Sequence, residues 1–238
     1  MERLGQPVVR GVNLTVTAGE VTVLLGANGV GKSTLLDGIS GVIPTSGGRV
    51  VMDGIDMTRS SRRHRAGNGL AYVQQGRTVF PGLTVEENFL VAAKRPNIHR
   101  AFELFPELRP RATVKAASLS GGEQQMVVLG RSVLQRPRVL MIDELSLGLA
   151  PVVVERMFES VARMAAEGLG VLLVEQFADR ALSLGRQASV LARGVFVLQG
   201  AAEDIRLQPE RLQAAYLGET ETAPADPIAS FDETKEDP

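Results

Sequence analysis

The sequence predicts an α/β domain whose core is a mostly parallel sheet flanked by helices. Three short apolar runs lead to this expectation, because strands buried on both faces of a parallel sheet are continuously apolar. They occupy residues 21–25, 139–142 and 171–174. A glycine-rich segment follows the first run and an acidic pair follows the second, and such sheets place ligand chemistry at the carboxyl ends of their strands.

The glycine-rich segment, Gly-Ala-Asn-Gly-Val-Gly-Lys-Ser-Thr, fits the phosphate-binding pattern G-x-x-x-x-G-K-[ST]. Glycines let backbone N–H groups turn toward phosphate oxygens, and Lys32 can reach the β- and γ-phosphates of a nucleotide. Ser33 can ligate Mg²⁺, and the helix expected over residues 33–39 adds its positive dipole end. A chance glycine-rich turn is the weaker alternative, because strand, motif and helix coincide. The predicted nucleotide contacts are Gly26, Ala27, Asn28, Gly29, Gly31, Lys32, Ser33 and Thr34.

Two stretches predict a small antiparallel β subdomain beside this core. Apolar and polar residues alternate over residues 12–17, as in a half-exposed strand. Residues 49–52 form a second short strand that ends at the turn signal Asp53-Gly54. Further along, residues 188–192 and 195–198 predict a last strand pair.

Residues of about 82–134 are predicted to form an α-helical subdomain after a strand at 70–73. Thr84 with Glu87, and Ser120 with Glu123, match the capping box that opens a helix. The second box leaves the glycines at positions 121 and 122 unexplained, since glycine costs about 0.8–1 kcal/mol relative to alanine in a helix. Consecutive glycines at a helix start are expected where a backbone approaches an anion closely.

Asp143 and Glu144 leave the end of the apolar run at 139–142. Asp143 can hold Mg²⁺, and Glu144 can polarise a water molecule. Pro151 is predicted to be the first residue of a helix that runs to Gly168.

Composition argues against several other classes of protein. The net charge of −1 gives no electrostatic reason to expect binding to nucleic acid or to an anionic membrane, and 4% aromatic residues disfavour a single-strand binder. The absence of cysteine excludes disulfides and thiolate metal sites. No signal peptide and no membrane-spanning run are expected. A basic cluster of Arg59, Arg62, Arg63, His64 and Arg65 is interpreted as a solvated helix face rather than a binding patch.

The order of these motifs resembles the ATP-binding cassette (ABC) ATPases over about residues 8–217. It consists of the phosphate loop, Gln75, the run Leu-Ser-Gly-Gly-Glu at 119–123, and Asp143-Glu144. The resemblance implies ATP and Mg²⁺ as cofactors, and an α/β nucleotide core with an antiparallel β subdomain and an α-helical subdomain. Residues 1–217 would then be one ABC ATPase domain. Residues 218–238, rich in Thr, Ala, Pro and acidic residues, predict a disordered tail.

The resemblance also implies a role for each motif residue. Lys32, Ser33 and Thr34 correspond to phosphate and Mg²⁺ contacts, Gln75 to the γ-phosphate sensor that also contacts the metal, Asp143 to the Mg²⁺-linked aspartate and Glu144 to the catalytic base. Ser120, Gly121 and Gly122 correspond to the loop that closes over ATP on a second ABC ATPase subunit. Gln176 stands where most of the family has a catalytic histidine at the γ-phosphate.

Finer features are similar to the LivF-type subunit of branched-chain amino acid importers. They lie at residues 75–77, 84–88, 146–151 and 174–176. This similarity implies a peripheral ATPase at the cytoplasmic face of the cell membrane, with two transmembrane permease subunits and, indirectly, an extracytoplasmic substrate-binding protein. The alternatives are a urea or amide importer ATPase, which shares Gln176, a soluble ABC-superfamily ATPase, and a catalytically silent binding module.

Four further features carry expectations. Leu145 and Gln74 replace prolines that are usual in the family, and Phe80 with Leu83 could face a permease or lie in the core. Residues 1–7 hold no aromatic residue to stack on adenine and no strand is expected there, so Arg3 is the candidate contact. Discrimination between MgATP and MgGTP is therefore expected to be weak.

Overall fold

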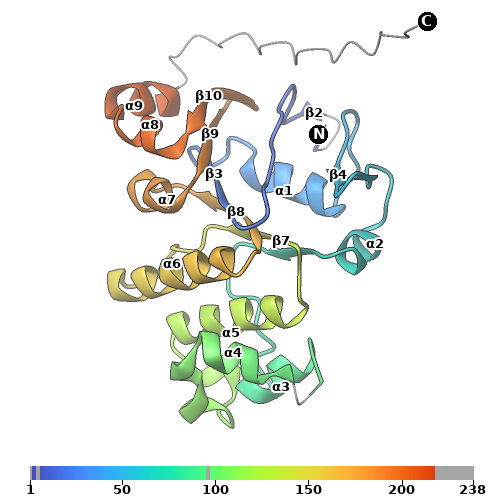
Figure 1. The fold of residues 1–238 in the computed structure, drawn as a ribbon, viewed down its shortest axis with the longest axis vertical. Coiled ribbons are helices and arrows are strands. Elements are labelled where there is room, and N and C mark those ends of the chain that lie inside the picture. The colour runs from blue at the N-terminus through green and yellow to red at the C-terminus, as the bar shows by residue number, and fades with distance from the viewer. Residues whose placement is uncertain (1, 4–5, 95–96, 218–238) are drawn as a thin grey trace, which may run out of the picture.

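A six-stranded sheet runs through the molecule (Figure 1). The computed structural model describes residues 2–3, 6–94 and 97–217. The strands lie in the order β10-β9-β3-β8-β7-β6, and only β10 is antiparallel to its neighbour. This confirms the predicted mostly parallel sheet. The strands are β3 (Val21–Leu25), β6 (Leu70–Val73), β7 (Val139–Asp143), β8 (Gly170–Glu175), β9 (Gln187–Ala192) and β10 (Val195–Ala201).

Helices connect these strands, and α3, α4 and α5 gather at the end of the molecule opposite α8 and α9 (Figure 1). Both predicted capping boxes form, and α6 begins at Pro151 as expected but ends two residues before Gly168. The helices are α1 (Lys32–Ser40), α2 (Arg62–Gly67), α3 (Val85–Leu90), α4 (His99–Leu104), α5 (Gly121–Leu134), α6 (Pro151–Ala166), α7 (Ala178–Leu184), α8 (Ala202–Arg206) and α9 (Pro209–Leu217), with 3₁₀ segments at Pro106–Arg111 and Ala116–Ser118.

The expected strand over residues 12–17 is not formed, which corrects the sequence prediction. Val12, Leu14 and Val16 do turn toward the core on the α1 side of the sheet, while Asn13 and Thr15 are exposed. The alternating pattern therefore predicted correctly which side chains face the core. A strand also requires a neighbouring strand with which its backbone can form hydrogen bonds. Of the segment predicted at 49–52, only β4 (Val51–Met52) is a strand, and it pairs with β5 (Ile55–Asp56) across the Asp53-Gly54 turn.

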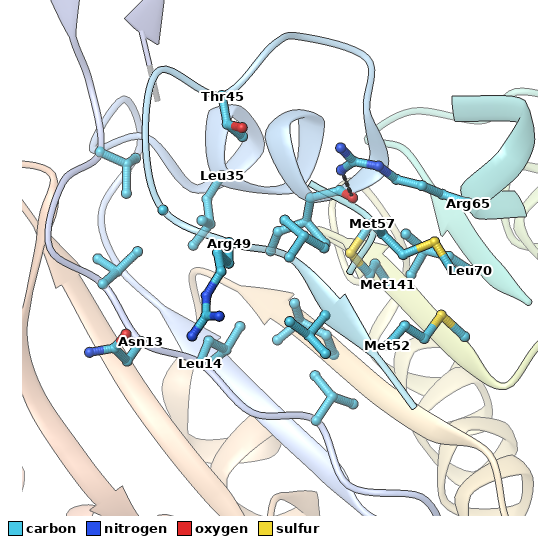
Figure 2. Close-up of a pocket in the computed structure, with 18 of the residues that line it drawn as sticks. Asn13, Leu14, Leu35, Thr45, Arg49, Met52, Met57, Arg65, Leu70 and Met141 are labelled. Atoms are coloured by element: carbon cyan, nitrogen blue, oxygen red, sulfur yellow. Dashed lines mark hydrogen bonds between the residues drawn. The ribbon is translucent and has the colours of Figure 1, made fainter. Parts of the chain in front are cut away.

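A cavity of about 740 Å³ lies beneath this part of the chain. Leu14, Leu35 and Met141 are among its lining residues, together with Arg49 and residues 45–48 (Figure 2). Residues 12–17 run along this cavity and have no strand partner, so space remains between them and the sheet. None of the residues predicted to contact phosphate or magnesium lines this cavity.

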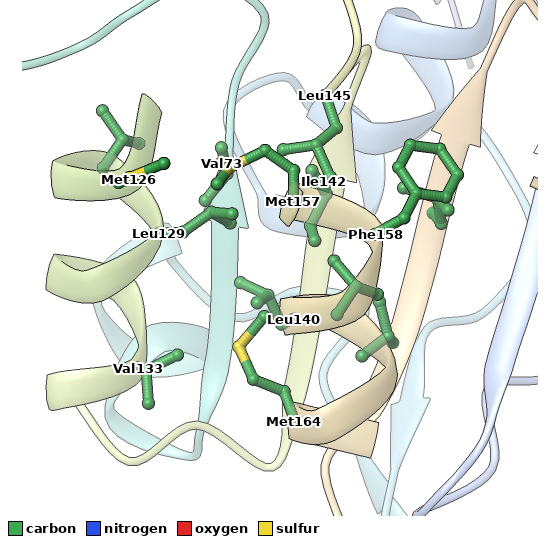
Figure 3. Close-up of a cluster of buried hydrophobic side chains, with 14 of the residues drawn as sticks. Val73, Met126, Leu129, Val133, Leu140, Ile142, Leu145, Met157, Phe158 and Met164 are labelled. Atoms are coloured by element: carbon green, nitrogen blue, oxygen red, sulfur yellow. The ribbon is translucent and has the colours of Figure 1, made fainter. Parts of the chain in front are cut away.

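The opposite face of the sheet carries the larger core. Along β7, Leu140 and Ile142 point to this side, whereas Met141 points to the α1 side. Helices α5 and α6 cover these residues (Figure 3). Because both faces of β7 are buried, its sequence is apolar without alternation. The Leu145 that replaces a proline is 1% exposed and packs in this cluster beside Met157, so its side chain has a packing role.

Arg65 differs from its basic neighbours and corrects the interpretation of this cluster as one solvated face. Its side chain is only 3% exposed, whereas Arg62, Arg63 and His64 are exposed. The guanidinium donates to the carbonyls of Gly38 and Ile39 at 2.8 and 2.5 Å, at the end of α1. It therefore caps the helix that begins in the phosphate loop.

Some predictions fall on parts of the chain without a structural description. The tail at residues 218–238 and the Arg3 side chain lie outside the described residues. Backbone strands β1 (Glu2–Arg3) and β2 (Gln6–Pro7) do pair, although no strand was expected before Val8. In the described ranges, no helix is both long enough and apolar enough to cross a membrane.

Candidate functional site

The candidate site lies where four neighbouring parallel strands end. The phosphate loop follows β3, Gln75 follows β6, and Gln176 follows β8, while Asp143 is the last residue of β7 and Glu144 comes directly after it. The carboxyl ends of parallel strands meet at one edge of the sheet, so segments distant in sequence converge here.

Backbone geometry in the phosphate loop requires glycine at two positions. Gly26 has φ 155°, and a Cβ atom there would lie 2.5 Å from the Leu191 carbonyl oxygen. Gly31 has φ 110°, and its Cβ would lie 2.9 Å from a methyl group of Val9. The Lys32 ammonium donates to the carbonyls of Gly26 and Ala27 at 2.8 and 3.0 Å. The loop thus holds its own buried cation where the motif places phosphate.

Glu144 is bound by two of the other predicted residues. Its Oε1 lies 3.7 Å from the Lys32 ammonium, and its Oε2 accepts a 2.6 Å hydrogen bond from the Gln75 amide. The Glu144 backbone has φ 51°, which is uncommon for a residue with a side chain, and its N–H donates to the Val174 carbonyl at 2.9 Å. This bend turns the carboxylate out of the strand and toward the phosphate loop.

Asp143 is the buried carboxyl of the site, with 1% exposure. Burial raises its pKa, while hydrogen bonding by Ser33 and the charge of Lys32 act in the opposite direction. The Tyr72 hydroxyl donates to its Oδ2 at 3.4 Å, but its Oδ1 is buried without a hydrogen-bond partner. A buried oxygen without a partner, next to a serine hydroxyl, fits a hard cation such as Mg²⁺.

Two residues outside the predicted set hold the end of β8. Glu175 is buried and accepts hydrogen bonds from the Ser146 backbone and hydroxyl at 3.0 and 2.7 Å. Tyr216 of α9 donates to the Gln176 carbonyl at 2.8 Å, and burial raises the Tyr216 pKa to about 12. The position of Glu175 directly after the apolar run at 171–174 was a sequence signal for it. Nothing local in the sequence linked Tyr216 to the site.

Ser120, Gly121 and Gly122 stand at the start of α5. Their hydrogen bonds in the described structure are those of the capping box and the helix, and none joins them to the phosphate loop. The glycines have a reason within the chain, which corrects the view that capping leaves them unexplained. A Cβ on Gly122 would lie 2.6 Å from a methyl group of Val153, and the Arg77 guanidinium occupies the Cβ position of Gly121.

The loop from Gln75 to Leu83 presents one aromatic ring to solvent. Phe80 is 43% exposed, and the Arg131 guanidinium lies 4.7 Å from its ring centroid. Asn88 is buried and bonds both the N–H and the carbonyl of Phe80, at 2.9 and 3.1 Å. The Asn88 side chain therefore fixes the backbone of this loop at Phe80. Leu83, further along the loop, is half-buried.

Comparisons with known proteins identify relatives of the whole described domain. A model of the ABC transporter family matches residues 9–146. A high-affinity branched-chain amino acid transport ATP-binding protein, BraG of Pseudomonas aeruginosa, is 37% identical, covering 87% of this chain and 91% of that protein. A probable branched-chain amino acid transport ATP-binding protein, LivF of Archaeoglobus fulgidus, is 34% identical over 87% and 91% of the two chains. A nucleotide-free ATP-binding cassette from an ABC transporter superposes with a TM-score of 0.79 at 25% identity, over 88% and 92% of the chains.

Proposed function

The chain belongs to the ABC transporter family as an ATP-binding, ATP-hydrolysing subunit, and from this premise we propose that it energises an importer of branched-chain or related amino acids. The observation that carries the substrate class is the 37% identity to the P. aeruginosa protein over nearly the whole described domain. The geometry at the ends of β3, β6, β7 and β8 supports the catalytic part of the proposal.

In the proposed reaction, ATP enters the phosphate loop and Lys32 turns from the carbonyls of Gly26 and Ala27 toward the β- and γ-phosphates. Asp143 and Ser33, with Gln75, would hold Mg²⁺, which neutralises phosphate charge when bound. Glu144 orients a water molecule and takes its proton as the water attacks the γ-phosphorus. The bond from that phosphorus to the ADP oxygen breaks, and ADP and phosphate leave. Gln176, which stands where most of the family has a histidine, would contact the γ-phosphate in this proposal.

We propose that the catalytic unit is a pair of ABC ATPase subunits. Lys32, Gln75, Asp143 and Glu144 converge within one chain, whereas the described structure shows no hydrogen bond from Ser120, Gly121 or Gly122 to that cluster. Ser120 is exposed and heads a helix whose N-terminus favours an anion. This arrangement supports a role for residues 120–122 on nucleotide bound to the second subunit.

Membrane attachment in this proposal is peripheral, at the cytoplasmic face and through two permease subunits. The exposed Phe80 and the loop held by Asn88 support a contact there. An extracytoplasmic substrate-binding protein would deliver the amino acid to the permeases. Cross-linking from position 80 to a permease should succeed, and a variant with Phe80→Ser should lose coupling of ATP hydrolysis to transport.

The deciding experiment is to purify the tagged chain from solubilised membranes of its source cells and to identify the proteins bound to it. Two permease subunits are expected. Recovery of the chain alone, or with cytosolic proteins only, would refute the transporter assignment in favour of an ABC-superfamily ATPase unconnected with transport.

Substrate class is tested by uptake in a strain that lacks the gene. Accumulation of radiolabelled leucine should fall and should return with the wild-type gene but not with Lys32→Ala. Normal leucine uptake with defective urea uptake would instead establish the urea importer alternative.

A further inference from the structure

Arg77 joins three segments of the candidate site that the sequence keeps far apart. It lies two residues after Gln75, and its guanidinium donates to the Gly148 carbonyl at 2.9 Å. The same guanidinium fills the space beside Gly121, with its two terminal nitrogens 2.5 and 2.6 Å from where a Cβ would stand. One side chain thus bridges the loop from Gln75 to Leu83, the start of α5 and the loop that follows Glu144.

The contact with Gly121 depends on the absence of a side chain there. An alanine at position 121 would collide with the movable end of Arg77 rather than with the backbone. Arg77 would swing away, and its bond to Gly148 would break. Gly122 is different, because its Cβ would meet Val153 of α6 and not Arg77. These neighbouring glycines therefore offer a matched pair of substitutions.

Arg77 is also connected to the catalytic carboxylate through a short piece of backbone. Gln75 donates to Glu144, and only Gly76, with φ 90°, separates Gln75 from Arg77. Nucleotide that drew Lys32 away from Gly26 and Ala27 would disturb the neighbouring Glu144 and its bond to Gln75. A displacement of Gln75 would then reach Arg77 through Gly76.

We propose that Arg77 is a positioning residue that transmits nucleotide occupancy from Gln75 to the start of α5 and to the loop at residues 146–149. This rests on the proposed function only in requiring that nucleotide occupy the phosphate loop. Arg77 touches no reacting atom. It sets the position of two segments according to what Gln75 contacts.

Amide hydrogen exchange on the full chain, with and without a non-hydrolysable MgATP analogue, tests this role. The reporters are the Glu123 amide, bonded to the Ser120 hydroxyl, and the Leu149 amide, bonded to the Ser146 carbonyl. In the wild type, nucleotide should change exchange at both by about tenfold, a shift typical of altered local opening. In Arg77→Ala the change should fall below about twofold, while protection of the phosphate loop persists.

Arg111→Ala is the matched control. Arg111 also contacts the start of α5, through an ion pair with Glu123 at 3.2 Å, but it lies outside the loop from Gln75 to Leu83. Its removal should leave the nucleotide response at Leu149 at the wild-type size. A role limited to general stability would make the two arginine variants behave alike, since neither would alter a nucleotide-dependent difference.

The glycine pair supplies a second test. Gly121→Ala should reduce the response at Leu149 in the wild type and have no further effect in Arg77→Ala, whereas Gly122→Ala should act equally in both backgrounds. An unchanged response in Arg77→Ala, with the phosphate loop protected, would overturn the proposal. If the nucleotide analogue did not protect the phosphate loop of the wild type from exchange, nucleotide binding itself would be refuted. Failure of this proposal and failure of the proposed function are therefore distinguishable.

Discussion

At the scale of single residues, the charged and polar groups of the candidate site bond one another. Lys32 is bonded to loop carbonyls, and Glu144 is held between Lys32 and Gln75. The left-handed backbone at Glu144 is the kind of local strain that persists where surrounding structure over-determines it. In the proposed function, nucleotide would therefore exchange partners with these groups, and this would link binding to the position of the proposed catalytic carboxylate.

Replacing Glu144 by glutamine should separate binding from hydrolysis. The amide keeps the shape of the side chain but cannot accept the proton of the attacking water, so turnover should fall by about 10²-fold or more. MgATP affinity should stay near that of the wild type, because Lys32 and the loop backbone hold the phosphates. Phosphate release by the purified transporter complex gives the rate. Glu155→Gln, which alters a surface ion pair with Arg180, is the control, and turnover of Glu144→Gln at the control rate would contradict the assignment.

Glu175 predicts a pH dependence of stability. Burial raises its pKa above the usual 4.5, although hydrogen bonds from Ser146 oppose the shift. A raised folded pKa means that its contribution to stability is complete below pH 4.5 and declines as pH rises through the folded value. Glutamine does not titrate. The free energy of unfolding of the wild type, relative to Glu175→Gln, should therefore decrease from pH 4.5 upward, as denaturant titrations would show. If the difference in free energy of unfolding between the wild type and Glu175→Gln were the same at every pH, titration of Glu175 would not contribute to stability.

At the scale of elements, helix α1 shows how the phosphate loop is held from both ends. Its N-terminus is fixed by the bend at Gly31, and its C-terminal carbonyls are bonded by Arg65. The guanidinium also donates to the carbonyls of Thr58 and Ser60, at 2.8 and 3.1 Å, so it ties α1 to the β4–β5 side of the chain. The basic cluster in the sequence concealed this role, because composition cannot distinguish a buried cation from solvated neighbours.

Arg65→Met should destabilise the domain by about 2–4 kcal/mol, because it removes the donor to the carbonyls of Gly38, Ile39, Thr58 and Ser60. Arg65→Lys should recover little, since a single ammonium cannot reproduce the forked contacts. Urea unfolding of each variant measures the loss, with exposed Arg63→Met expected within about 0.5 kcal/mol of the wild type. Equal stabilities for Arg65→Met and Arg63→Met would show that the cap contributes nothing.

The elements also show what the sequence could and could not predict. The buried strand β3 was placed at its observed bounds because burial on both faces leaves a continuous apolar run. Residues 12–17 were wrongly assigned to a strand on the basis of their alternation. Alternation indicates only which side chains face the core, whereas a neighbouring strand to pair with depends on the tertiary structure. The short helices α7 to α9 carry no strong caps in the sequence, so Tyr216 could not be brought to Gln176 without the structure.

At the scale of the whole molecule, strands β3, β6, β7 and β8 bring the residues of the candidate site to one edge of the sheet, and α5 presents residues 120–122 separately. Motif order in the sequence predicted the members of both groups, because each motif carries its own local chemistry. Their connection through Arg77 and Gly148 was not predictable, since it depends on how α5 packs beside the sheet. The roles of these residues in ATP binding and hydrolysis stay predictions, and activity measurements on the transporter complex test them.

A bulky charge at position 120 tests whether that second group acts on another subunit. Ser120→Arg should leave MgATP binding to the isolated chain unchanged, because Ser120 has no bond to the phosphate loop in the described structure. It should abolish turnover in the transporter complex, where the side chain would obstruct the opposite nucleotide.

Ser120 also caps α5, accepting a 3.3 Å hydrogen bond from the Glu123 amide, so its loss alone should cost about 1 kcal/mol of stability. Ser120→Ala removes this cap without adding bulk and isolates that contribution. The complex should therefore lose less turnover with alanine than with arginine. If an isolated chain carrying Ser120→Arg hydrolyses ATP as fast as the wild-type complex, one subunit is sufficient, and residues 120–122 serve only to start a helix.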